Sequence, residues 1–269
     1  MGDELAQIAT WRANVAELVT DCCERWELRA GEPYVPGVCG HVLRVDLRDG
    51  TPAVLKIVWP HREAEQEADA LEAWDGDGAV RLLARDDELH ALLLERCEPG
   101  SFLSTAADPV GVLIELLPRL WRSGDGFSSL EAETEQWAES MLETPDHALR
   151  DVALGYIREL APTQGEQVLV NQDLHGENVL AAQREPWLAI DPKPLAGERE
   201  FSAASIVRSS ELGHGKRDVL YRLDRLCSEL DLDCERAKGW TIAQTIAWSG
   251  GSDYVDIHMQ TVQWLLEDA

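Results

Sequence analysis

The chain has 269 residues, of which 45% are hydrophobic, and its 24 basic and 50 acidic side chains give a formal net charge of −26. This composition indicates a globular protein with one large domain or two modest lobes. The charge argues against nucleic acid or an anionic membrane as the main partner, because phosphate groups repel such a surface. It is compatible with a cationic small molecule, and equally with an acidic surface that only keeps the protein soluble.

The N-terminal segment and the cysteines favour a cytoplasmic protein. Residues 1–26 lack the basic start and apolar core of a secretory signal, and no run of about 18 apolar residues predicts a membrane span. The six cysteines show neither C-x-x-C pairing nor the spacing of a metal finger. A chain of this length forms a core without disulfides, so we expect reduced thiols.

The first 97 residues predict one helix followed by a small antiparallel sheet that carries a second helix. Helical periodicity, strand alternation and a turn at 48–51, where Gly50 supplies positive φ, define these elements. In chain order they are a helix over 4–28, strands over 42–47 and 52–59, a helix over 60–74, and strands over 80–85 and 89–95. We predict that residues 1–97 form an N-terminal lobe.

Helical patterns dominate the rest of the chain, with a β-rich island between them. The helical stretches run over 108–160 and 201–267, and the short strands over 167–171, 179–182 and 187–190. The break at 96–101 contains Pro99-Gly100 and is consistent with a hinge or with an ordinary loop. The pattern therefore predicts an α+β protein whose second lobe, residues 98–269, is mostly helical.

Three polar residues stand at the strand ends of the β-rich island. Asp173 and Asp191 each follow a short apolar run, and Asn178 directly precedes one. Strand ends fix side-chain directions, so we expect the three to converge. One Asp and one Asn suit Mg²⁺ bound to a triphosphate, and the other Asp would accept a proton from an attacking hydroxyl. Turns explain each residue singly, because Asp and Asn favour turns, but they explain the joint spacing poorly.

Lys56 lies inside an apolar strand, where Leu55 and Ile57 point to the other face. A buried lysine is costly without an anion, so we expect it to meet either Glu67 or a phosphate. The alternative is an edge-strand lysine that deters aggregation.

Two motifs carry a resemblance to a known family. Residues 173–180, DLHGENVL, resemble the D-L-H-x-x-N-[VI]-L motif of aminoglycoside phosphotransferases. Residues 190–201, IDPKPLAGEREF, resemble a stretch of the streptomycin 6-kinase subgroup, also described as the aminoglycoside/hydroxyurea resistance kinases. The resemblance extends from about residue 30 to the end of the chain. It implies a protein-kinase-like, two-lobed fold that uses ATP and Mg²⁺ to phosphorylate a hydroxyl of an aminoglycoside-like acceptor.

The resemblance also implies roles for individual residues. Asp173 matches the catalytic aspartate, Asn178 and Asp191 match the metal ligands, and Lys56 matches the lysine that holds the α- and β-phosphates. The expected partner of Lys56 is Glu67, with Glu63 as the alternative. Further nucleotide contacts are expected from a hinge at Glu95 and Cys97 and from a glycine flap at Gly37 and Gly40, for which an ordinary turn is the alternative. Weaker candidates for acceptor contacts are Glu198, Glu200, Asp253 and Asp256.

The sequence departs from the family pattern at two places. Asn171-Gln172 replaces the usual His-Gly before Asp173, and Ser202 follows Phe201 where the subgroup tends to have an acid. His175 has no second histidine at ligand spacing, so we interpret it as a residue that structures the loop. Two alternatives stay open: a metabolic sugar or amino-sugar kinase on the same fold, and a pseudokinase-like module that binds nucleotide without turnover.

Overall fold

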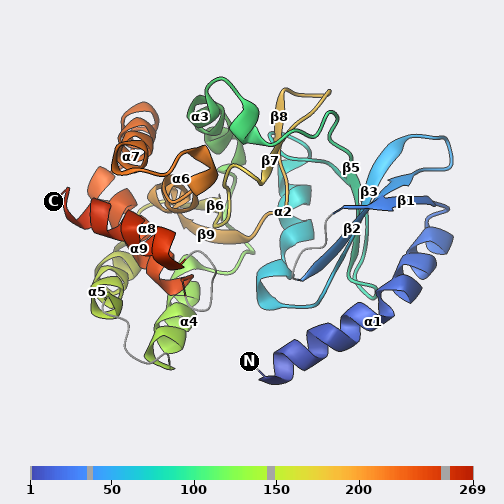
Figure 1. The fold of residues 1–269 in the computed structure, drawn as a ribbon, viewed down its shortest axis with the longest axis horizontal. Coiled ribbons are helices and arrows are strands. Elements are labelled where there is room, and N and C mark those ends of the chain that lie inside the picture. Colours follow the sequence, from blue (N-terminus) through green and yellow to red (C-terminus); the bar gives the residue numbers. More distant parts are fainter. Residues whose placement is uncertain (1, 35–38, 144–148, 250–254, 269) are drawn as a thin grey trace.

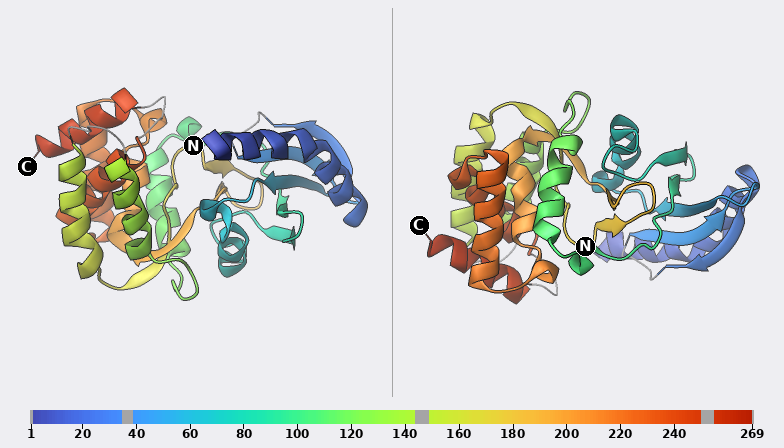
Figure 2. Two further views of the ribbon diagram at one scale, coloured as in Figure 1. Left: turned by 90° about the horizontal axis from the view of Figure 1, so that it is seen from below. Right: turned by 90° about the horizontal axis from the view of Figure 1, so that it is seen from above.

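A computed structural model describes residues 2–34, 39–143, 149–249 and 255–268. A sheet and a larger group of helices form two masses joined by a narrower waist (Figures 1 and 2). The predicted α+β, two-lobed architecture is confirmed. None of the described helices is long and apolar enough to cross a membrane.

The N-terminal lobe is built on a five-stranded antiparallel sheet with the order β1-β2-β3-β5-β4. Its strands are β1 (Arg29–Pro33), β2 (Gly40–Asp46), β3 (Pro52–Val58), β4 (Leu82–Asp86) and β5 (Ala91–Glu95). Lys56 stands opposite Val42 of β2 and Leu92 of β5. It therefore lies on the central strand, which excludes the alternative of an edge-strand lysine. The predicted hairpin turn is present, with Gly50 at φ 88°.

Helices cover both faces of this sheet (Figure 1). The helix α1 (Gly2–Arg25) lies along one face, and α2 (Glu67–Trp74) lies between the other face and the helical lobe. Alternate residues of β5 point to opposite faces of the sheet. Leu93 packs in the core under α1, whereas Leu92 and Leu94 pack with α2. The core under α2 continues into the helical lobe. The predicted boundary between residues 97 and 98 stays a prediction.

The helical lobe is organised around one central helix. Its helices are α3 (Pro109–Leu120), α4 (Leu130–Glu143), α5 (Arg150–Leu160), α6 (Ala203–Val207), α7 (Lys216–Leu230), α8 (Cys234–Ala247) and α9 (Val255–Leu266). Short 3₁₀ helices are η1 (Arg62–Ala64), η2 (Leu103–Thr105), η3 (Ala161–Thr163), η4 (Arg199–Ser202) and η5 (Ser210–Leu212). The helix α8 is buried on all sides from Ala237 to Ile246, which is typical of a helix enclosed by its neighbours.

Two small antiparallel strand pairs lie where the lobes meet, and they position the site. β6 (Gln167–Asn171) pairs with β9 (Pro194–Glu198), and β7 (Val179–Ala181) pairs with β8 (Trp187–Ala189). Asn171 stands opposite Pro194, and Val179 stands opposite Ala189. The loops that carry the predicted chemistry therefore leave these strands at neighbouring points.

The sequence missed two strands and joined two helices. β1 was missed because all five of its residues are exposed, so it has no apolar alternation. β9 was missed because it contains proline and glycine; Gly197 is needed there, since a Cβ would lie 3.0 Å from Leu130 of α4. The helix predicted over 60–74 is divided into η1 and α2.

Side chains of the helical lobe hold the start of α2. The Gln66 amide donates to the Gly126 carbonyl oxygen at 2.8 Å and accepts from the Ser128 backbone N–H at 2.8 Å. Arg62 forms an ion pair with the buried Glu133 of α4. These contacts across the lobes fix the position of Glu67, the first residue of α2.

Candidate active site

Lys56 forms a buried ion cluster with two carboxylates. Its Nζ lies 2.6 and 2.7 Å from the two Glu67 oxygens and 2.5 Å from Asp191 Oδ1. Burial opposes the positive charge, but the two carboxylates outweigh it and raise the pKa of Lys56. The sequence left Glu67 and Glu63 as alternatives, and the structure places Glu67 against Lys56. Glu63 instead lies 3.3 Å from the ammonium of Lys193.

A cleft of about 560 Å³ opens beside this cluster. Its walls come from β2, β3, the loop after β3 and residues 191–193, and they include Cys39, Gly40, Trp59, Asp191 and Lys193. Gly40 begins β2 at this wall, whereas Gly37 lies outside the described residues. A lysine, a carboxylate and a backbone flap around one cleft suit the phosphates of a nucleotide.

The predicted hinge residues lie at the end of β5, whose last residue is Glu95, and both side chains contact the protein. The Glu95 carboxylate binds Arg184 at 2.9 Å, and the Glu95 backbone N–H donates to Arg81. Cys97 is buried, and burial raises the pKa of its thiol to about 12. Contacts from this segment to an adenine would therefore come from the backbone.

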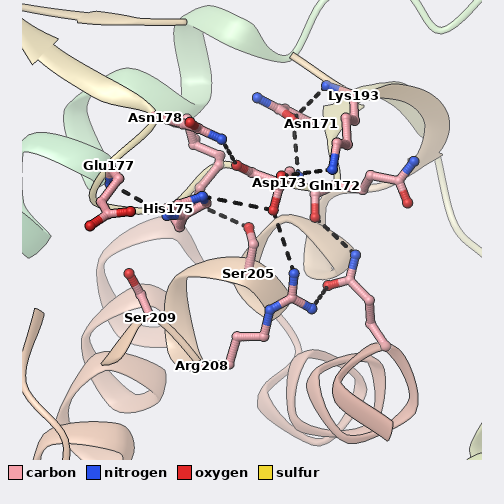
Figure 3. Close-up of polar contacts among 12 residues, drawn as sticks. Asn171, Gln172, Asp173, His175, Glu177, Asn178, Lys193, Ser205, Arg208 and Ser209 are labelled. Atoms are coloured by element: carbon pink, nitrogen blue, oxygen red, sulfur yellow. Dashed lines mark hydrogen bonds and ion pairs between the residues drawn. The ribbon is translucent and has the colours of Figure 1, made fainter. Parts of the chain in front are cut away.

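Asp173 stands between the cations Lys193 and Arg208, with the His175 ring also close to it (Figure 3). Its Oδ2 lies 3.0 Å from Lys193 Nζ. Its Oδ1 lies 3.6 Å from a guanidinium nitrogen of Arg208 and 4.0 Å from His175 Nε2. The carboxylate is thus partly buried and oriented by charge, which suits a group that must meet a hydroxyl in one defined direction.

Asn178 and Asp191 lie together at the ends of β7 and β8. The Ile190 backbone N–H donates to the Asn178 carbonyl oxygen at 2.9 Å, which brings Asp191 beside Asn178. Asn178 Nδ2 donates to the Asp173 carbonyl oxygen, and the amide oxygen points away from this bond (Figure 3). Lys56 lowers the pKa of Asp191, so this carboxylate is ionised.

These two side chains fit a magnesium ion that is shared with phosphates. Magnesium takes few protein oxygens and completes its shell with water and phosphate. The described residues hold no group of three or more His, Cys, Asp or Glu side chains that could bind a metal alone. Asn178 and Asp191 would therefore hold the ion together with a bound triphosphate.

Asn171 and Gln172, which replace the family's His-Gly, fix the loop through backbone contacts. Asn171 Oδ1 accepts from the backbone N–H groups of Asp173 at 3.0 Å and Lys193 at 3.1 Å. The Gln172 carbonyl oxygen accepts from Gln244 Nε2 at 2.9 Å. Asn171 thus links the loop of Asp173 to the segment of Lys193, so the departure from the pattern keeps the loop ordered.

His175 belongs to a hydrogen-bond network that structures the loop. Glu211 Oε1 contacts His175 Nδ1 and accepts from the Gly176 backbone N–H, both at 2.8 Å. Burial opposes ionisation of Glu211, but its hydrogen bonds to His175 and Ser209 lower its pKa to about 2. The interpretation of His175 as a residue that structures the loop is consistent with these contacts.

This network predicts a pH-dependent stability. The pKa of Glu211 is lower in the folded protein than in the unfolded chain, so its contribution is complete above pH 4.5 and disappears as the pH falls towards 2. We expect Glu211→Gln to lower the free energy of unfolding by about 2–3 kcal/mol at pH 6 and by much less at pH 3. Urea denaturation at both pH values measures this, with the exposed Glu177→Gln as the control. An equal loss at both pH values would contradict the assignment.

The weaker acceptor candidates do not gather around Asp173. Glu198 ends β9 and Glu200 lies in η4, which follows it. Glu198 is buried and binds Arg236 at 2.7 Å and the Trp240 indole at 2.5 Å. This placement contradicts an acceptor contact by Glu198, and Glu200 accepts from the backbone at the start of α8. Asp253 lies outside the described residues.

Asp256 is the one remaining acceptor candidate among the described residues. It is exposed near the start of α9. That helix approaches the site through His258, whose Nδ1 lies 3.4 Å from Ser249 Oγ, next to Trp248. A contact between Asp256 and the acceptor stays a prediction.

The corrected position of Glu198 has a measurable consequence. Removing this carboxylate leaves Arg236 and Trp240 without their buried partner, so we expect Glu198→Ala to lower the free energy of unfolding by about 3 kcal/mol. The acceptor KM should stay unchanged. The matched control is Glu166→Ala, which removes an exposed carboxylate paired with Arg199. A raised acceptor KM at unchanged stability would restore the original prediction.

Sequence reasoning missed two cations of the site and the ring that supports them. Lys193 and Arg208 both lie over Trp248, at 4.9 and 4.6 Å from its ring centroid. Burial lowers the pKa of Arg208 to about 10. The sequence contains a feature that could have indicated each residue. Lys193 lies between two prolines in a recognised motif, and Arg208 directly follows the apolar run of α6.

Comparisons with known proteins agree with this geometry. The family model of the aminoglycoside/hydroxyurea antibiotic resistance kinases matches residues 25–252. Streptomycin 6-kinase of Streptomyces griseus is 36% identical over 88% of this chain and 82% of its own length. Hydroxyurea phosphotransferase of Kitasatospora aureofaciens is 38% identical over 85% of this chain and 70% of its own length.

Solved structures share the fold at low identity. A choline kinase of Streptococcus pneumoniae superposes with a TM-score of 0.69 at 15% identity, over 94% of this chain and 99% of its own. Aminoglycoside phosphotransferase APH(4)-Ia gives 0.62 at 14% identity, over 94% and 96%. These neighbours show the protein-kinase-like fold, and the match of the family model over most of the sequence shows that the chain belongs to the aminoglycoside/hydroxyurea antibiotic resistance kinase family and is a phosphotransferase.

Proposed function

We propose that this protein transfers the γ-phosphoryl group of ATP, bound with Mg²⁺, to a hydroxyl of a streptomycin-type aminoglycoside. The observation that carries the proposal is the placement of Asp173 beside the cleft that holds Lys56 and Asp191. Direct transfer needs a nucleotide phosphate held on one side and a hydroxyl oriented on the other.

The nucleotide side of the site is assigned to the N-terminal lobe and the β7–β8 loops. Lys56, fixed by Glu67, supplies a positive charge for the phosphates, and Asn178 and Asp191 supply oxygens for Mg²⁺. The ion would neutralise charge on the phosphates during transfer. Asp173 accepts the proton of the attacking hydroxyl.

Two observations support a cationic acceptor. The relatives include streptomycin 6-kinases from two Streptomyces species, each 36% identical to this chain. The net charge of −26 also attracts a polycationic molecule over distances within the Debye length of about 8–10 Å. Resistance to an antibiotic, in which phosphorylation inactivates the molecule, is the biological role that this chemistry supports.

One observation favours a second class of acceptor, small uncharged hydroxyl compounds. The hydroxyurea phosphotransferase is 38% identical to this chain, so a small uncharged hydroxyl compound is the alternative substrate. The cations Lys193 and Arg208 beside Asp173 also mean that the immediate surroundings of the carboxylate are not uniformly acidic. A neutral sugar belongs to the same alternative.

A salt series distinguishes these acceptors. The KM of a polycationic acceptor should rise clearly between about 50 and 300 mM salt, because ions screen its attraction to the acidic protein. The KM for MgATP should change less. A flat acceptor KM would reject the cationic class and favour the uncharged one.

A pseudokinase-like binding module is disfavoured by the residues present. Lys56, Asp173, Asn178 and Asp191 are all in place, and Lys56 is paired with Glu67. If the protein binds nucleotide without turnover, MgATP will raise its melting temperature while no acceptor in a panel of aminoglycosides, amino sugars, neutral sugars and hydroxyurea consumes ATP.

A further inference from the structure

Lys193 lies between two acidic residues that belong to different lobes. Its Nζ is 3.0 Å from Asp173 Oδ2 in the helical lobe and 3.3 Å from Glu63 Oε2 in η1, the 3₁₀ helix before α2. The side chains of Lys193, Asp173 and Glu63 are 25, 15 and 30% exposed, so all three charges are partly withdrawn from water. An ammonium shared by two partly buried carboxylates is held more firmly than one in a surface pair.

The backbone and the stem of Lys193 are held as well. Its N–H donates to Asn171 Oδ1 at 3.1 Å, its carbonyl oxygen accepts from Gln172 at 3.0 Å, and its ammonium lies 4.9 Å from the Trp248 ring centroid. Two carboxylates and the face of an aromatic ring therefore surround this ammonium. Lys193 is therefore a fixed, charged group.

The contact with Lys193 gives the two carboxylate oxygens of Asp173 different surroundings. Oδ2 has the ammonium of Lys193 at hydrogen-bond distance. Oδ1 faces Arg208 and His175 at 3.6 and 4.0 Å, which are longer than hydrogen bonds. An acceptor hydroxyl can therefore approach Oδ1 while Oδ2 stays bound. Lys193 also lines the cleft that holds Lys56 and Asp191.

We propose that Lys193 is a positioning residue for phosphoryl transfer. Its ammonium binds Oδ2 of Asp173 and, at the same time, Glu63 of the other lobe, and this leaves Oδ1 of Asp173 for the acceptor hydroxyl. This inference rests on the proposed function. Because Glu63 belongs to η1 of the other lobe, this contact ties the orientation of Asp173 to the position of that lobe. A misplacement of about 1 Å in such a group costs about 10²-fold in rate.

Kinetics of three variants test this role. Lys193→Met keeps an apolar stem over Trp248 and removes the charge, so kcat should fall about 10–100-fold, while nucleotide Kd and acceptor KM change less than about threefold. Lys193→Arg keeps both ion pairs and should recover most of kcat. Glu63→Gln should lower kcat to an intermediate value. The control is Lys238→Met, which removes another largely buried lysine, paired with Glu235 on α8, and should leave kcat unchanged.

A spectroscopic readout tests the contact without turnover. The chain has four lysines, so ¹⁵N-lysine labelling gives few ammonium signals, and the Lys193 signal is identified by its loss in Lys193→Arg. This signal should shift in Asp173→Asn and in Glu63→Gln. It should not shift in Glu235→Gln, which removes the partner of Lys238.

The outcomes separate this inference from the proposed function. Wild-type protein that phosphorylates no acceptor contradicts the proposed function. Active wild-type protein with an unchanged kcat in Lys193→Met contradicts the role of Lys193 alone. If Lys193→Met does not fold, the role of Lys193 is judged from the kinetics of Lys193→Arg and Glu63→Gln and from the ammonium spectra. A Lys193 ammonium signal that shifts neither in Asp173→Asn nor in Glu63→Gln overturns the inference.

Discussion

Replacing Asp173 with Asn is expected to lower kcat about 10²–10⁴-fold while nucleotide affinity changes little. The amide keeps the size of the side chain but accepts no proton from the hydroxyl. The loop should stay folded, because it is held through the backbone of Asp173, which binds Asn171 and Asn178. Steady-state kinetics with an equilibrium titration of ADP would measure both quantities.

The control for Asp173→Asn must remove a nearby negative charge that has no part in transfer. Glu177→Asn serves, because Glu177 is exposed four residues further along the same loop. A turnover near that of the wild type in Asp173→Asn would remove the assignment of this residue as the base. A large loss of ADP affinity would show that it acts on the nucleotide instead.

Replacing Asp191 with Ala is expected to abolish the tightening of ATP binding by Mg²⁺ and to lower kcat/KM about 10³-fold. Asp191 supplies the carboxylate of the proposed metal site and also contacts Lys56. Its loss therefore removes a metal ligand and leaves Lys56 paired with Glu67 alone. Titration of ATP with and without Mg²⁺, in wild type and variant, measures the effect.

Asp151→Ala is the matched control for Asp191→Ala. It removes a carboxylate of the same type from an exposed position on α5, where the side chain is 91% exposed. Its ATP affinity should respond to Mg²⁺ as the wild type does. If Mg²⁺ tightens ATP equally in all three proteins, the metal role of Asp191 is wrong.

The parts of the site that sequence reasoning found share one property: each is fixed by a strand. Lys56 lies within β3, Asp173 follows β6, and Asn178 and Asp191 stand at the ends of β7 and β8. Strand periodicity and chain spacing are local signals, so they predict where such side chains point. The same reasoning found four of the five strands of the N-terminal sheet and the helical character of the second lobe.

The parts that were missed depend on contacts between distant segments. Arg208 and Asp173 come together only because α6 packs under the loop of Asp173, and Lys193 meets Glu63 only because η1 reaches across from the other lobe. Glu198 stood in a recognised motif, which suggested a role in binding. In the structure Glu198 instead binds Arg236 and Trp240 of α8, and no local sequence pattern connects it to these residues.

Product analysis with four candidate acceptors determines whether this chain phosphorylates an acceptor hydroxyl. Purified protein is incubated with MgATP and, separately, streptomycin, hydroxyurea, an amino sugar and a neutral sugar, and the products are identified by mass and by ³¹P NMR. We predict that streptomycin gains one phosphoryl group on an oxygen, with one ADP formed per product, and that Asp173→Asn forms almost none. Formation of ADP without any phosphorylated acceptor, or no reaction with all four compounds, would contradict it.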